Sequence, residues 1–180
     1  MKKQTLIILI LFGFSVTAYA QESEKSNGMV YGFQLGQYQK DFGFGLNITS
    51  PLFVHDNIAL RLRGNLMFNE HPENNETQWT PYSNVSLGIM SGRTKLGDYL
   101  AVYGEGGVIG LFPSDEFSTE DFVFGGYGIF GFEFLIDDHV NYFIELGGVG
   151  TGAEADQIPN APIYSNGFLI NVGFRVTFSD

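Results

Sequence analysis

The sequence contains no cysteine among its 180 residues. This absence excludes disulfide bonds, thiolate-bound metal ions and a lipid-carrying N-terminal cysteine. Basic residues are also scarce, with 9 Lys and Arg against 20 Asp and Glu, and the formal net charge is −11. Nucleic acid is a polyanion and is therefore a poor partner for this chain.

The mature part of the chain has no long hydrophobic run and no sustained helical period. Its longest apolar stretch, residues 122–136, is shorter than the ~20 residues that a membrane-spanning helix needs. The stretch also contains Glu133 and several glycines, which disfavour a helix. The abundant residues are instead Phe (18), Tyr (9) and Gly (24), a composition that favours strands with close backbone contacts.

The first 20 residues are typical of a secretory signal peptide. Two lysines at positions 2 and 3 precede an apolar segment, Leu6–Phe14, and an A-x-A cleavage site at Ala18-Tyr19-Ala20. The polar run that follows disfavours the alternative, an uncleaved anchor. Cleavage after Ala20 removes two lysines and no acid, and so takes the formal charge from −11 to −13. We expect a short periplasmic linker over residues 21–28 and one domain over residues 29–180.

The rest of the chain alternates between large apolar residues and small or polar ones. In the last such window, Phe168, Ile170 and Val172 share one face while Asn171 and Arg175 lie on the other. About eight windows of this kind occur between turn-forming residues. The windows are Met29–Tyr38, Phe42–Leu52, Ile58–Phe68, Pro81–Met90, Tyr99–Phe112, Phe122–Ile136, Val140–Val149 and Gly167–Phe178.

The connections between these windows alternate in length. Short connections are expected at residues 53–57, 91–98 and 137–139, and longer acidic ones at residues 69–80, 113–121 and 150–166. The first connection, residues 39–41, is short where the alternation would place a long one. Short turns at one end and long loops at the other are typical of a membrane barrel, and the windows have the length that a tilted strand needs to cross a bilayer. The sequence therefore predicts an all-β fold, an eight-stranded antiparallel up-and-down transmembrane β-barrel with short periplasmic turns and longer outer loops.

The face opposite the apolar stripes carries charged residues of both signs. These residues are Arg61, Arg63, Glu105, Glu133, Glu145 and Arg175. If the apolar stripes face lipid, the six side chains share one polar lumen, where three cations and three anions neutralise one another. The favoured interpretation is a network that plugs the lumen, because small barrels have filled interiors; the alternative is a proton or ion path.

The reverse orientation would make the protein a soluble exported barrel or sandwich. About thirty large apolar side chains would then point inward, more than the interior of an eight-stranded barrel holds. We therefore favour lipid outside, and keep a soluble barrel that binds a hydrophobic ligand as an alternative.

No catalytic, cofactor or metal site is predicted. Residues Gly126–Gly131 match G-x-G-x-x-G, but they lie within a predicted strand and open no helix, as a dinucleotide site would require. His55 and His139 fall in short turns and His71 in a long loop, so no histidine lies on a strand beside a serine as the base of a hydrolase triad. The acidic loops follow no calcium-binding pattern.

The plan of residues 29–178 resembles the small bacterial outer-membrane barrels of the OmpA/OmpX type. The sharpest element of this resemblance is the final strand, where Phe174, Val176 and Phe178 alternate and end on an aromatic ring, although Ser179 and Asp180 follow it. The resemblance implies that these three residues are the signal read by the barrel-assembly machinery.

Together these features predict an integral protein of the outer membrane in a Gram-negative bacterium. We expect a monomer that is not an enzyme and has a structural or surface-interaction role through its extracellular loops. A narrow ion or small-solute channel is the first alternative, and a barrel enzyme acting on lipid is the second. The expected partners are outer-membrane lipid and, during biogenesis, the barrel-assembly machinery, with no nucleic acid and no cofactor.

Overall fold

A computed structural model describes residues 28–73, 76–137 and 139–178, and in these ranges the chain consists of β-strands joined by turns and loops. The strands are β1 (Met29–Tyr38), β2 (Asp41–Thr49), β3 (Ile58–Glu73), β4 (Glu76–Ser91), β5 (Thr94–Lys95), β6 (Leu100–Phe112), β7 (Val123–Leu135), β8 (Val140–Gly150) and β9 (Gly167–Phe178). No helix within the described ranges is long and apolar enough to span a bilayer. The expected signal peptide and residues 21–27 of the expected linker lie outside these ranges.

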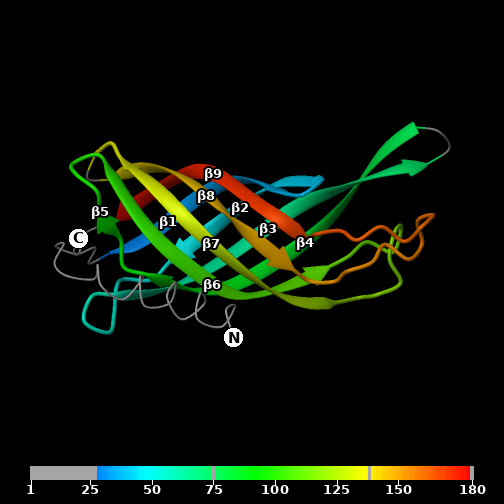
Figure 1. The fold of residues 1–180 in the computed structure, drawn as a ribbon, viewed down its shortest axis with the longest axis horizontal. Coiled ribbons are helices and arrows are strands. Elements are labelled where there is room, and N and C mark those ends of the chain that lie inside the picture. The colour runs from blue at the N-terminus through cyan, green and yellow to red at the C-terminus, as the bar shows by residue number, and fades with distance from the viewer. Residues whose placement is uncertain (1–27, 74–75, 138, 179–180) are drawn as a thin grey trace, which may run out of the picture.

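The strands form one antiparallel sheet that closes on itself (Figure 1). β1 pairs with both β2 and β9, and the ring is completed where β4 pairs with β6. The two-residue β5 pairs with the start of β6, where it continues the line of β4. The predicted eight-stranded antiparallel barrel is therefore confirmed, with β1–β4 and β6–β9 as its eight strands.

The two ends of the barrel differ. At one end, which we call the turn end, β1 begins, β9 finishes, and short connections join β2 to β3, β4 to β6 and β7 to β8 (Figure 1). At the other, the loop end, lie the tight β1–β2 turn, the β3–β4 hairpin and the long β6–β7 and β8–β9 connections. The long connections of the described chain thus lie at the end of the barrel opposite the start of β1 and the finish of β9.

The apolar stripes predicted from the sequence lie on the outside of the barrel. Leu46 and Ile89 are 66% and 60% exposed, whereas the inward-facing Asn47 and Arg61 are 2% and 1% exposed. Each outward residue alternates with an inward one because successive side chains of a strand point to opposite faces. An outer face this rich in exposed apolar side chains is typical of a barrel surrounded by lipid.

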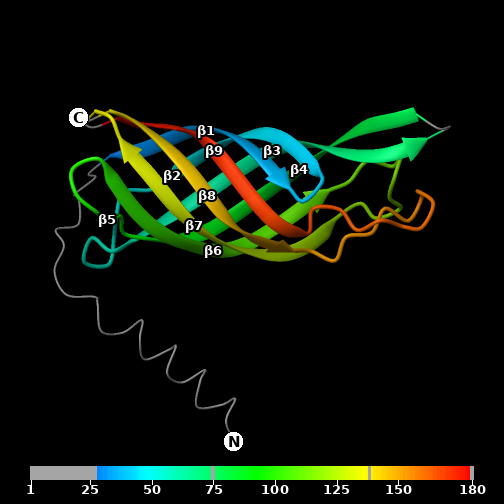
Figure 2. The ribbon, with the colours of Figure 1, turned by 45° about the horizontal axis from the view of Figure 1, so that its top comes forward.

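The structure corrects one predicted loop. Residues 69–80 are not an irregular loop, because β3 and β4 continue as a paired ribbon as far as Glu73 and Glu76. The sequence predicted a loop here because the apolar alternation ends at Phe68 and a polar, acidic stretch follows. Beyond the rim a strand pair needs no lipid-facing stripe, so backbone pairing continues without one. The resulting hairpin projects past the barrel rim at the loop end (Figure 2).

Candidate functional site in the barrel lumen

The six charged residues predicted to share the lumen all lie there. Each is at most 5% exposed and comes from an inward position of its strand. Arg61 and Arg63 lie on β3, Glu105 on β6, Glu133 on β7, Glu145 on β8 and Arg175 on β9. Five strands therefore contribute to one cluster, which we call the charge network. Barrel closure brings β3 opposite the neighbouring strands β6–β9.

Glu145 is the centre of the charge network. Its Oε1 accepts hydrogen bonds from Arg175 Nη2 at 2.6 Å and from Arg61 Nη1 at 3.0 Å, and its Oε2 accepts one from Arg63 Nη1 at 3.0 Å. Asn171 Nδ2 donates a further bond to Oε2 at 3.0 Å. Burial of an isolated carboxylate is costly, and these charge-assisted bonds offset that cost.

Glu105 links the two arginines of β3. Its Oε2 accepts hydrogen bonds from Arg61 Nη1 and Arg63 Nη2, each at 2.7 Å. Its Oε1 accepts one from the Tyr127 hydroxyl at 2.6 Å. The planar guanidinium of each arginine can reach two carboxylates at once, which a lysine ammonium does less well.

Tyr103 joins the cations and anions of the charge network. Its hydroxyl donates to Glu145 Oε1 at 2.6 Å and accepts from Arg175 Nη2 at 2.7 Å. The guanidinium carbons of Arg61 and Arg175 lie 5.2 and 5.1 Å from its ring centroid. Gly131 faces Tyr103 on the neighbouring β7, and a Cβ placed there would overlap the tyrosine ring. The packing of Tyr103 therefore requires a glycine at position 131, the last glycine of the G-x-G-x-x-G match.

A seventh buried charge, Arg93, was not predicted as a lumen residue. Arg93 Nη1 donates to Glu133 Oε1 at 2.8 Å, while Arg175 Nη1 donates to Glu133 Oε2 at 3.1 Å. The sequence placed Arg93 in a short turn, outside the alternating windows. Alternation between strand faces therefore could not show whether its side chain points inward. With Arg93 included, the charge network holds four arginines and three glutamates.

A layer of amide side chains follows the charge network toward the loop end. Gln34 Nε2 donates to Asn65 Oδ1 at 2.8 Å, and Gln34 Oε1 accepts from Asn47 Nδ2 at 3.0 Å. Asn65 Nδ2 in turn donates to Asn84 Oδ1 at 2.7 Å. All four amides are buried, so this layer fills the lumen on the side of β1–β4.

The loop end of the lumen is aromatic and apolar, which corrects the expectation of a polar lumen throughout. Phe117 of the β6–β7 connection and Tyr164 of the β8–β9 connection pack edge to face, with ring centroids 4.9 Å apart. Both rings also pack edge to face on Tyr82 of β4, at 5.9 and 5.3 Å. We call this arrangement the aromatic cap. Inward residues of the strands complete its apolar cluster, including Ile109, Leu111 and Leu169.

Polar contacts hold the aromatic cap on the barrel. The buried Asp41 Oδ2 accepts hydrogen bonds from the Tyr82 hydroxyl and from the Ser165 backbone N–H, both at 2.8 Å. Gln157 N donates to the Phe117 carbonyl at 3.1 Å, which joins the two long connections to each other. Both connections therefore fold over and into the mouth of the barrel.

A second link between the two long connections is solvent-exposed. The backbone N–H of Thr119 donates to Asp156 Oδ1 at 2.8 Å, and the Thr119 hydroxyl donates to the other carboxylate oxygen. These two hydrogen bonds lower the pKa of the Asp156 carboxyl below its ordinary value. The carboxylate form of Asp156 therefore favours the closed arrangement of the loops.

The sequence matches no protein-family model and no curated protein. Two solved structures from Pseudomonas aeruginosa resemble the fold. The N-terminal β-barrel domain of OprF aligns with a TM-score of 0.59 at 13% identity, over 85% of this chain and 98% of that domain. The outer membrane protein OprG aligns with a TM-score of 0.51 at 11% identity, over 89% of this chain and all of that one (100%).

This chain has the fold of a small outer-membrane β-barrel of the OmpA/OmpX type. At such low identity the likeness concerns the fold alone.

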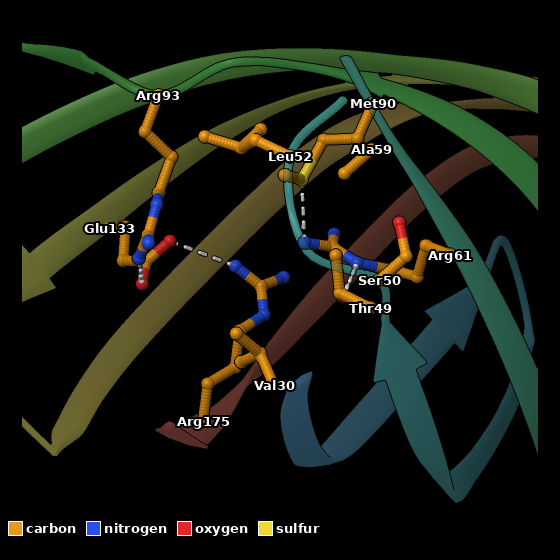
Figure 3. Close-up of a pocket in the computed structure, with 10 residues that line it drawn as sticks. All are labelled: Val30, Thr49, Ser50, Leu52, Ala59, Arg61, Met90, Arg93, Glu133 and Arg175. Atoms are coloured by element: carbon orange, nitrogen blue, oxygen red, sulfur yellow. Dashed lines mark hydrogen bonds and ion pairs between the residues drawn. The ribbon is translucent and has the colours of Figure 1, made fainter. Parts of the chain in front are cut away.

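The turn end of this outer-membrane barrel fold contains a small pocket of about 20 Å³. Three guanidinium groups and one carboxylate line it, from Arg61, Arg93, Arg175 and Glu133 (Figure 3). The remaining lining residues are Val30, Thr49, Ser50, Leu52, Ala59 and Met90. The pocket is thus bounded by strand residues, by the turn that follows β2 and by Arg93 between β4 and β5.

The predicted assembly signal lies on β9. Phe174 is 40% exposed on the outer face, Val176 is half-buried, and the side chain of Phe178 lies outside the described residues. The role of these residues in assembly stays a prediction. Among the described residues, no three His, Asp or Glu side chains converge as a metal site.

Proposed function

We propose that this protein is an integral outer-membrane barrel whose lumen is closed and whose role is structural or interactive through the loop end. The observation that carries the proposal is the filling of the lumen. From the turn end to the loop end it holds the charge network, the amide layer and the aromatic cap. A solute would have to displace buried ion pairs and packed rings along this whole path.

The loop end is the part that offers contacts to other molecules. Exposed acidic residues gather there, including Glu70, Glu116, Glu120, Asp121 and Glu154. The β3–β4 hairpin extends beyond them, and a rigid barrel that presents loops is a common way to build a binding surface. In a barrel inserted from the periplasm the short turns stay inside and the long loops reach the exterior.

Planar-bilayer recording tests the closed lumen. The refolded wild type should show no discrete conductance steps, because the charge network and the aromatic cap leave no continuous aqueous path. If steps appear and their size changes in Arg61→Gln or Glu133→Gln, the protein is a narrow channel and the closed-lumen proposal is wrong.

Cysteine labelling tests the location and the orientation. The chain has no cysteine, so each introduced cysteine is a unique label. In intact cells a membrane-impermeant maleimide should label Glu120→Cys in the β6–β7 connection. It should label the matched variant Asp98→Cys, at the turn end, only after the outer membrane is permeabilised. Labelling of both variants in intact cells, or of neither, would contradict the proposed orientation.

A further inference from the structure

We propose that the turn-end pocket binds one small inorganic anion of the size of chloride, held by Arg61, Arg93 and Arg175. Figure 3 shows these guanidinium groups converging on the pocket from different parts of the barrel, with Glu133 as the carboxylate among them. Chloride binding at this pocket would be a property of the lumen, and it does not depend on whether the loops bind a partner.

The first reason is charge. The four buried arginines of the charge network face three buried glutamates, which leaves one positive charge in excess. The remaining buried carboxylate of the described chain, Asp41, accepts its bonds from Tyr82, Asn69 and Ser165 near the aromatic cap. A buried charge without a counter-charge is strongly disfavoured, and a bound anion would restore neutrality at the turn end.

The second reason is hydrogen bonding. Arg175 Nε is buried and has no hydrogen-bond partner, although Arg175 is only 2% exposed. Arg61 Nη2 donates to the Met90 sulfur at 2.7 Å, and a thioether is a weak acceptor. Both arginines line the pocket. An anion there would accept bonds from donors that the protein itself leaves poorly satisfied.

The third reason is size. A space of about 20 Å³ is enough for one small particle, since a cavity needs roughly 10–15 Å³ to hold a water. Chloride is a single atom only moderately larger than a water molecule, whereas sulfate and phosphate are larger still and carry several oxygens. Arg93 lies where the pocket reaches the turn end, and its side chain is 9% exposed, so an ion can exchange with the solvent on that side.

Urea unfolding of the refolded barrel at constant ionic strength tests this site, with gluconate replacing chloride. The folded fraction is measured from the gel mobility of unheated samples. Chloride that binds the folded state alone should raise the folded-to-unfolded ratio about 100-fold at 100 times its dissociation constant. Bromide should act like chloride, and sulfate should not.

Arg93→Gln and Glu133→Gln should move the chloride response in opposite directions. Arg93→Gln removes one cation from the pocket and should abolish most of the response, while Arg93→Lys should retain much of it. Glu133→Gln removes the competing carboxylate and should enlarge the response. Lys95→Gln is the matched control. Lys95 lies two residues after Arg93 and carries the same charge, but its side chain does not line the pocket.

Equal urea midpoints in chloride and gluconate would overturn the proposal, as would an unchanged response in Arg93→Gln relative to Lys95→Gln. If Arg93→Gln does not fold, crystals of the wild type grown in bromide decide the question. An anomalous peak between Arg61, Arg93 and Arg175 supports the site, and a pocket holding water alone rejects it.

Discussion

At the scale of single residues, the stability of this barrel depends on how its buried charges compensate one another. Glu145 accepts hydrogen bonds from three arginines, and no other carboxylate of the described lumen does so. Each of these guanidiniums is itself buried, so the loss of Glu145 would leave several cations poorly compensated.

We therefore expect Glu145→Gln to lower the free energy of unfolding by about 3–5 kcal/mol, which is the cost of removing one partner of a buried ion pair. Urea titration in detergent measures it. Glu70→Gln is the control, because Glu70 is exposed on the β3–β4 hairpin and its loss should cost no more than about 0.5 kcal/mol. Equal effects of the two substitutions would mean that the charge network does not stabilise the barrel.

A glycine substitution tests the packing of Tyr103. Gly131→Ala would push a methyl group into the Tyr103 ring, and overpacking of this kind costs about 1–3 kcal/mol. Gly64→Ala is the matched control, because Gly64 also lies within a strand and an added Cβ meets no atom within 4 Å. The same urea titration compares them, and a larger loss in Gly64→Ala would contradict the role assigned to Gly131.

At the scale of elements, the two long connections behave as one lid because they bind each other as well as the barrel. The Thr119–Asp156 link holds them together outside the lumen, while Phe117 and Tyr164 hold them inside it. The first link depends on ionisation and the second does not.

Acid should weaken the Thr119–Asp156 link before it affects the packing of Phe117 on Tyr164. The pKa of Asp156 is lowered in the folded protein, so the link is fully present above the ordinary pKa of an aspartate, near pH 4, and is lost as the pH falls through the lowered value. Hydrogen exchange should then accelerate at the backbone of residues 113–122 and 151–166 relative to the strands. Asp156→Asn should remove this pH dependence, and a variant that keeps it would assign the effect to another group.

At the scale of the whole molecule, closure of the sheet satisfies the backbone. Each of β1–β4 and β6–β9 has a partner on both sides, and a closed barrel leaves no open edge in the bilayer. Ion pairs and packed rings then join opposite walls across the lumen.

The protein should therefore resist SDS until it is heated. Membrane fractions loaded without heating should give a folded band of different mobility from the heated sample, because the closed barrel stays intact in the detergent. A single mobility together with recovery in the soluble periplasmic fraction would contradict the membrane assignment.

The sequence by itself determined the strands and their faces. Alternation of period two assigns each side chain to a face, and it placed residues such as Arg61 and Glu145 inside before any pairing was known. Turn lengths then ordered the strands into an up-and-down barrel. Both properties are local, since each depends on residues close together in the chain.

Only the tertiary structure decided which inward residues meet and what closes the lumen. Glu145 and Arg61 come together because the sheet closes, and their distance depends on the strand stagger, which alternation does not report. Arg93, Phe117 and Tyr164 lie in connections, where no period exists to predict their direction. The β3–β4 hairpin was missed for a related reason: beyond the lipid, backbone pairing alone extends a strand and leaves no apolar stripe in the sequence.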